Sequence, residues 1–80
     1  MKILKFQADW CQPCKMLTNV LKDIKTDVEI EVIDIDQNPE MAKKYNIRGV
    51  PTLVKLNDEI VVSQSIGLKS KEQLEKWINE

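Results

Sequence analysis

Segments with the apolar pattern of β-strands alternate along the chain with segments of helical periodicity, and this alternation restricts the possible folds more than any other feature. Residues 2–8 carry apolar side chains on both faces, which is typical of a strand that is covered on each side. Apolar residues recur at helical spacing from Pro13 to about Lys25, and residues 29–35 have the pattern of a second strand. Because two strands that are joined through a helix usually run parallel, this half of the chain predicts a right-handed βαβ unit.

The second half of the chain predicts two more helices. Asn38 is a typical capping residue, and Pro39 fits the first position of a short helix, where the N–H that proline lacks would be unpaired anyway. The last helix follows the sequence SKEQ, in which Ser70 and Gln73 form the pattern of a capping box.

A hairpin is expected between these two helices. Residues 51–56 and 59–66 have the composition of strands, and Asn57 and Asp58 are expected to connect them, with Gly67 ending the second strand. The predicted order is therefore strand, helix, strand, helix, strand, strand, helix. This βαβαββα order predicts an α/β fold in which helices cover both faces of a four-stranded mixed sheet.

The length and the charge balance restrict the partners. The 80 residues leave room for one domain, residues 1–80. The 12 basic and 13 acidic residues give a net charge of −1 and form no long block, so we expect no binding to nucleic acid or to a membrane. No apolar run is long enough for a signal peptide or a membrane span. We expect a cytoplasmic monomer that acts on proteins or small molecules, in a compartment that disfavours permanent disulfides.

The chain has two cysteines, Cys11 and Cys14, in the stretch DWCQPCK. A structural zinc site takes about four ligands, and the chain offers two thiols and no histidine, so we expect no metal within one chain and no other cofactor. A cluster that is shared by two chains, each giving both cysteines, is an alternative.

Redox chemistry explains the spacing of these cysteines better. Side chains three residues apart in the first turn of a helix lie roughly 5–6 Å apart, close enough to form and break a disulfide. Cys11 would lie at the N-terminus of the helix, where unpaired N–H groups favour a thiolate, so it is the expected nucleophile. Cys14 would lie one turn further in, covered by the structure, which suits a resolving thiol.

Three stretches of the chain together resemble the thioredoxin family: DWCQPCK, DIDQNPEMAKKYNIRGVPTLV and IGLKSKEQLEKWI. The resemblance covers nearly the whole chain. It implies a thioredoxin-like fold and a thiol-disulfide oxidoreductase that reduces disulfides in protein substrates. It also implies that Cys11 is the nucleophile, that Cys14 resolves the mixed disulfide, and that a thioredoxin reductase or a similar donor recharges the pair.

The resemblance also assigns residues to the substrate. It implies that Pro51 is a cis-proline facing the disulfide and that Gly67 lets a substrate chain approach. Gln12 stands where the family usually has a glycine, and the residue types leave open whether Trp10 lies on the surface or in the core. The expected substrate-binding residues are Trp10, Gln12, Pro13, Val50, Pro51 and Gly67.

Lys5 is the main departure from the family pattern, because the family has a buried aspartate at this position and a lysine at the position of Val32. In parallel neighbouring strands, Lys5 would share a layer with Val32 and Asp34. Our hypothesis is that Lys5, paired with Asp34, is the ionisable group behind Cys14 and stabilises its thiolate. The alternative places the Lys5 stem over apolar surface and its amine in water.

Three other functions are left open by the sequence. The chain is close in length to a glutaredoxin, so a glutathione-dependent reductase is the first alternative. A binding module that retains the fold without catalysis is the second, and the shared cluster carrier is the third. Reduction of a disulfide by the dithiol form would distinguish a reductase from the last two.

Overall fold

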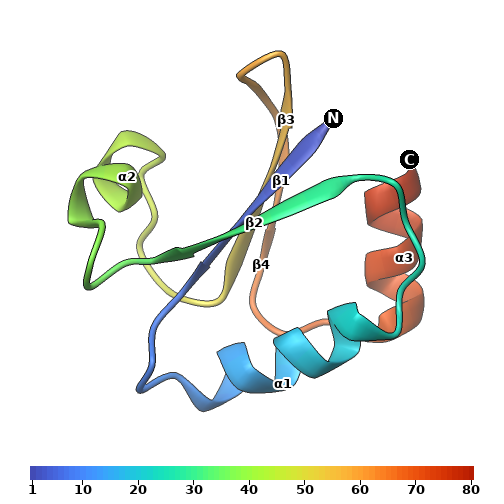
Figure 1. Cartoon of the computed structure of the whole chain (residues 1–80), viewed down its shortest axis with the longest axis horizontal. Coiled ribbons are helices and arrows are strands. Elements are labelled where there is room, and N and C mark those ends of the chain that lie inside the picture. The colour runs from blue at the N-terminus through green and yellow to red at the C-terminus, as the bar shows by residue number, and fades with distance from the viewer.

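The computed structural model describes all 80 residues and contains four strands and three helices in the predicted order. Figure 1 shows their arrangement. The elements are β1 (Lys2–Gln7), α1 (Gln12–Lys22), β2 (Glu29–Asp34), α2 (Pro39–Lys44), β3 (Thr52–Asn57), β4 (Ile60–Ile66) and α3 (Lys71–Asn79).

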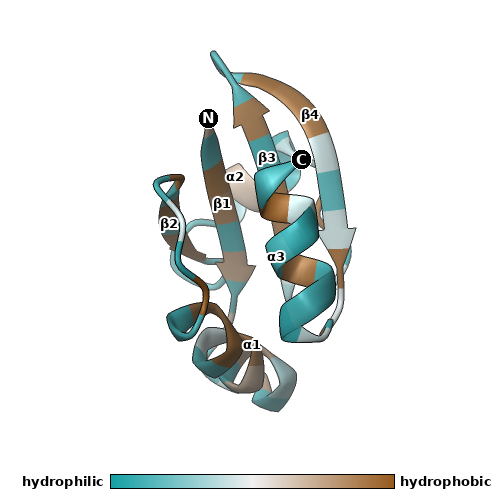
Figure 2. Ribbon diagram, turned by 90° about the vertical axis from the view of Figure 1, so that its right-hand side faces the viewer, coloured by the Kyte–Doolittle hydropathy of each residue, from teal (hydrophilic) through white to brown (hydrophobic).

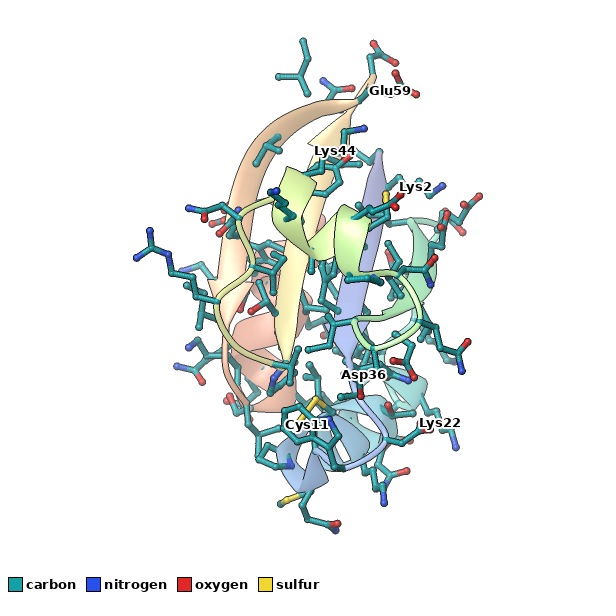
Figure 3. All side chains as sticks on the ribbon, turned by 90° about the vertical axis from the view of Figure 1, so that its left-hand side faces the viewer. Lys2, Cys11, Lys22, Asp36, Lys44 and Glu59 are labelled. Atoms are coloured by element: carbon teal, nitrogen blue, oxygen red, sulfur yellow. A yellow bond between two sulfur atoms is a disulfide. The ribbon has the colours of Figure 1, made fainter.

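The four strands form one mixed sheet in the order β2-β1-β3-β4, as predicted. β1 pairs in parallel with β2 and antiparallel with β3, and β3 pairs antiparallel with β4. α3 lies in front of the sheet in Figure 2, and α2 lies in front of it in the opposite view of Figure 3. The prediction of helices on both faces is therefore confirmed.

Each face of the sheet has its own hydrophobic core, because successive side chains of a strand point to opposite faces. On one face, Ile3 of β1 packs with residues of α1 and α3. On the other face, Leu4 and Phe6 pack with β2 and β3, and α2 with its following loop covers them. The first cluster comprises Ile3, Leu17, Ile24, Leu53, Leu74 and Ile78, and the second comprises Leu4, Phe6, Ile33, Val54 and Leu56.

The first helix is shorter than predicted, because it ends at Lys22 and not near Lys25. Asp23 caps its end, and the N–H of Ile24 donates to the carbonyl of Leu21 in a tightened turn. Ile24 is nevertheless buried in the core. Its burial explains why the apolar spacing continues beyond the helix.

The hairpin turn lies one residue later than predicted. Asn57 is the last residue of β3 and pairs with Ile60, so Asp58 and Glu59 form the turn. Both turn residues have positive φ angles, of 52° and 69°, as a two-residue hairpin connection requires. The pairing between the strands sets this register, and the residue types do not reveal it.

The two predicted helix caps differ in the structure. The Ser70 hydroxyl accepts a hydrogen bond from the N–H of Gln73, and the Gln73 side chain accepts one from the N–H of Ser70, which confirms the capping box. Asn38 precedes α2 as predicted, but its side chain makes no capping hydrogen bond. None of the three helices has the length and apolar character that a membrane crossing requires.

Candidate redox site

Cys11 and Cys14 form a disulfide at the start of α1, just after the end of β1. Cys11 is the residue that caps the helix, and Pro13 lies in the first turn. The Cα atoms of the two cysteines are 5.2 Å apart. Figure 3 shows the bond between the sulfur atoms beside Cys11, at the opposite end of the sheet from Glu59 in the hairpin turn.

The backbone at the start of α1 donates a hydrogen bond to the sulfur of Cys11. The N–H of Cys14 lies 3.1 Å from the Cys11 Sγ. This N–H is one of those that the helix itself leaves unpaired, and it carries part of the positive end of the helix dipole. The same geometry would stabilise a negative charge on Cys11 when the disulfide is reduced.

Both cysteines are largely covered in the disulfide form. Cys14 is 1% exposed and Cys11 is 4% exposed, and both pack with Ala8. Ile35 and Val50 lie against the same small cluster. The sequence indicated the burial of Cys14 but not that of Cys11, because a residue at a helix start has no fixed exposure.

The loop before β3 and the end of β4 meet beside the disulfide cluster. The Val50–Pro51 peptide bond is cis, the isomer that the resemblance implies. The N–H of Gly67 donates to the carbonyl of Pro51 at 2.9 Å, and the hydroxyl of Thr52 donates to the carbonyl of Gly49 at 2.8 Å. Gly67 has a φ of 85°, a conformation that disfavours other residues. These hydrogen bonds hold the loop in place.

Trp10 lies on the surface, since it is 70% exposed. Its indole N–H donates to a carboxylate oxygen of Asp36 at 2.9 Å, and Figure 3 shows Asp36 close to Cys11. Gln12 and Pro13 are also exposed. We did not predict Asp36 as a site residue. The signal that could have found it is the acidic turn directly after β2, at the same edge of the sheet as the cysteines.

Lys5 is buried below this site, with 2% of the residue exposed. Its amine donates to the side-chain oxygen of Gln7 and, at 2.6 Å, to the hydroxyl of Thr18. The Thr18 hydroxyl in turn donates to the carbonyl of Cys14 at 3.1 Å. Burial lowers the pKa of Lys5 from its ordinary value. The sequence did not identify Gln7 or Thr18 as members of the site.

The predicted pairing of Lys5 with Asp34 is wrong. The register of β1 and β2 places Val32 opposite Lys5 and Asp34 opposite Gln7. The carboxylate of Asp34 accepts a hydrogen bond from the N–H of the nearby Asp36, at 2.8 Å. The ion pairs of the chain join Lys2 to two glutamates and do not involve Lys5. The alternative that placed the Lys5 amine in water is also wrong.

The comparison with known proteins gives a consistent result. The Thioredoxin family model matches residues 1–80. The thioredoxin of Bacillus subtilis is 42% identical over 79 residues, which cover 94% of this chain and 76% of the relative. The thioredoxin of Rickettsia bellii is 38% identical over 81 residues, which cover 96% of this chain and 77% of the relative.

Two solved structures are similar over nearly the whole chain. A mutant thioredoxin from Halobacterium salinarum has a TM-score of 0.91 and 39% identity, and the match covers 98% of this chain and 71% of that protein. Mitochondrial thioredoxin 3 from Saccharomyces cerevisiae, in its oxidised form, has a TM-score of 0.86 and 34% identity. The match covers 98% of this chain and 76% of that protein.

Proposed function

The chain belongs to the thioredoxin family and is a protein disulfide oxidoreductase, and we propose that Cys11 is its attacking thiol and Cys14 its resolving thiol. The observation that carries this assignment is the hydrogen bond from the N–H of Cys14 to the Sγ of Cys11. That bond and the helix terminus favour a thiolate at Cys11. Cys14 does not occupy the capping position, because it lies within the first turn of the helix.

The proposed cycle has two exchange steps. In the first, the Cys11 thiolate attacks one sulfur of a substrate disulfide, so that a mixed disulfide forms and the other substrate sulfur leaves as a thiolate. In the second, Cys14 loses its proton to water and attacks the sulfur of Cys11. The Cys11–Cys14 disulfide forms, the bond to the substrate breaks, and two electrons have passed to the substrate.

The surface around the disulfide supplies the proposed substrate-binding residues. Trp10, Gln12 and Pro13 are exposed next to the cysteines in the chain. Val50 packs against the cysteine cluster, and hydrogen bonds hold the loop that contains Val50 and Pro51. We propose that an extended substrate segment pairs with the backbone of Val50, as peptides do on exposed extended backbone. The proposed set is Trp10, Gln12, Pro13, Val50, Pro51 and Gly67.

We also propose that the charge of Lys5 assists the second step. Its amine is connected by hydrogen bonds, through the Thr18 hydroxyl, to the backbone carbonyl of Cys14. A positive charge near a thiol favours the thiolate form. Asp34 has no part in this proposal.

Substrates in the family are disulfides, and a reductase supplies the electrons. We further propose that a thioredoxin reductase recharges this single domain, which works as a monomer in the cytoplasm. A dithiol reductant requires a reducing compartment, which supports this location. Reduction of the oxidised protein by NADPH and thioredoxin reductase should be much faster than reduction by glutathione. Fast turnover with glutathione alone would favour the glutaredoxin-like alternative.

Trapping of mixed disulfides tests the assignment of the two cysteines. The Cys14→Ser variant should accumulate a covalent complex with a disulfide-containing protein through Cys11, because the resolving thiol is missing. The Cys11→Ser variant is the matched control and should trap almost none. Equal trapping by the two variants, measured on a non-reducing gel, would refute the assignment.

A further inference from the structure

A polar cluster of three side chains lies between β1 and α1, next to the hydrophobic core. Lys5 and Gln7 come from β1, and Thr18 comes from α1. Lys5 is among the largest fully buried side chains of the chain, at 2% exposure. A buried amine of this kind needs hydrogen-bond acceptors, and the oxygens of Gln7 and Thr18 supply them.

The surroundings of Lys5 contain no carboxylate that pairs with it. On β3, Leu53 lies opposite Lys5, and on β2 its neighbour is Val32. From α1, Lys22 lines the same hollow as Lys5, so the other charged residue of the hollow has the same sign. Asp34 bonds to the backbone of its own loop. The charge of Lys5 is therefore solvated only by neutral groups.

Thr18 connects this amine to the catalytic pair. Its hydroxyl oxygen accepts from the Lys5 amine at 2.6 Å, and its proton is donated to the carbonyl of Cys14 at 3.1 Å. Because the hydroxyl proton is directed at the Cys14 carbonyl, the hydroxyl oxygen is free to accept from the Lys5 amine. The bond from Thr18 is to the backbone carbonyl of Cys14, and the thiolate forms on the side chain of that same residue before the second exchange step.

We propose that Thr18 is a positioning residue of the resolving step, whose hydroxyl holds the Lys5 ammonium behind Cys14 so that its charge stabilises the Cys14 thiolate. This inference rests on the proposed role of Cys14 as the resolving thiol. In the step itself, Cys14 loses its proton to water and its sulfur bonds to that of Cys11, while the substrate thiolate leaves. Lys5 keeps its proton throughout, and Thr18 exchanges none.

A hollow lies beside the cluster and is lined in part by Lys5. It has a volume of about 210 Å³ and lies between α1 and β2. Figure 3 shows Lys22 on α1, at the rim of the molecule. The residues that line the hollow are Lys5, Thr18, Leu21, Lys22, Ile30 and Val32.

Single-turnover kinetics with an aromatic disulfide that releases a coloured thiol separates the two exchange steps. The first release reports attack by Cys11, and the second reports resolution by Cys14. Thr18→Val keeps the shape of the side chain and removes the hydroxyl. We expect it to slow the second release about threefold to tenfold at neutral pH, to move the pH midpoint of that step upward, and to leave the first release unchanged.

Four further variants show whether Thr18 acts through Lys5. Thr18→Ser restores the hydroxyl and should restore the rate and the pH midpoint. Lys5→Met should slow the second release at least as much as Thr18→Val, and the double variant should be no slower than Lys5→Met alone. Lys22→Met removes the other lysine of the hollow and should leave the rate within about twofold of the wild type.

Two results would overturn the proposal. One is an unchanged rate and pH midpoint in Thr18→Val. The other is a Thr18→Val effect that persists in full in the Lys5→Met background, because Thr18 would then act through the helix and not through the charge. Failure of the underlying assignment would look different: Cys14→Ser would still show a second release at the wild-type rate. A circular dichroism melt of each variant confirms that it is folded before the kinetics are compared.

Discussion

Two lysines, Lys5 on β1 and Lys55 on β3, are buried on the same face of the sheet, and their surroundings differ. The register places Leu53 opposite Lys5 and Ile3 opposite Lys55, so both stems enter the core that α1 and α3 cover. They are 2% and 3% exposed, respectively. Burial alone therefore does not distinguish them.

The charge of Lys55 lies against the end of a helix and an aromatic ring. Its amine donates to the backbone carbonyl of Trp77 and lies 4.6 Å from the centroid of the Trp77 ring. Trp77 is near the C-terminus of α3, where unpaired carbonyls carry the negative end of the helix dipole. The aromatic face attracts the cation as well. Lys55 thus joins α3 to the sheet.

The charge of Lys5 has only the neutral oxygens of Gln7 and Thr18. Burial lowers the pKa of Lys5, in the direction expected for an amine that lacks a counter-ion. A thiolate at Cys14 would supply a negative charge, and it forms only in the reduced protein. The two lysines therefore differ in the kind of partner and not in burial: a helix terminus and an aromatic ring hold Lys55, whereas two neutral side chains hold Lys5, one of them bonded to Cys14.

Removal of Lys55 should cause the largest loss of stability. Lys55→Ala deletes the bond to the α3 carbonyl, the contact with the Trp77 ring and the packing of the stem, so we expect a loss of about 2–3 kcal/mol in the free energy of unfolding. Urea unfolding of the oxidised protein measures it. Lys5→Met, which replaces an uncompensated buried charge by an apolar side chain of similar length, is the control and should lose little or gain stability. Equal losses in both variants would remove the distinction between the two lysines.

The pH dependence of stability should also separate the two regions. Burial lowers the pKa of Lys5 below 10.5, so between the folded-state pKa and 10.5 the unfolded chain binds more protons than the folded chain. The free energy of unfolding should therefore rise with pH in that window, by up to about 1.4 kcal/mol per pH unit, and the full penalty should apply below it.

Urea unfolding of the oxidised wild type and of oxidised Lys5→Met across this range isolates the contribution of Lys5, because the thiols do not titrate in the disulfide form. The stability of the wild type relative to the variant should increase with pH. A difference that is constant or falls with rising pH would contradict the account of Lys5.

The smallest expected effect concerns the indole of Trp77, which also anchors α3. Its N–H donates to the hydroxyl of Ser63 at 2.9 Å. Ser63→Ala should lower the free energy of unfolding by about 1 kcal/mol, because the indole N–H loses its acceptor. Both exchange rates should stay at their wild-type values. A slower resolving step in this variant would show that the α3 region also influences the chemistry.

The sequence predicted the order of the elements and the mixed sheet, because apolar periodicity reports burial directly. It did not predict the end of α1, since Ile24 stays buried after the helix has ended. It also did not predict that Lys55 is buried, although LVKL in β3 places one lysine among apolar residues just as ILKF does around Lys5. A single lysine within an apolar strand run was the available signal at both places.

The details of the site depended on three-dimensional pairing. The alternation of β2 placed Val32 and Asp34 on one face, but the strand register decided that Val32 and not Asp34 lies opposite Lys5. Thr18 reads as an ordinary polar residue of a helix, and its contact with Lys5 depends on how α1 crosses the sheet. Motif spacing located the cysteines, whereas their hydrogen-bonded surroundings come from packing.

The role of Lys5 in resolution is tested most directly by the rate of the resolving step as a function of pH in Lys5→Met and in Lys55→Met. Both variants remove one buried lysine charge from the same face of the sheet and keep an unbranched side chain. If Lys5 assists resolution, this step should slow about threefold to tenfold in Lys5→Met, with its pH midpoint moved upward by about 0.5–1 unit, and should be unchanged in Lys55→Met. Wild-type rates and midpoints in both variants, or equal changes in both, would contradict it.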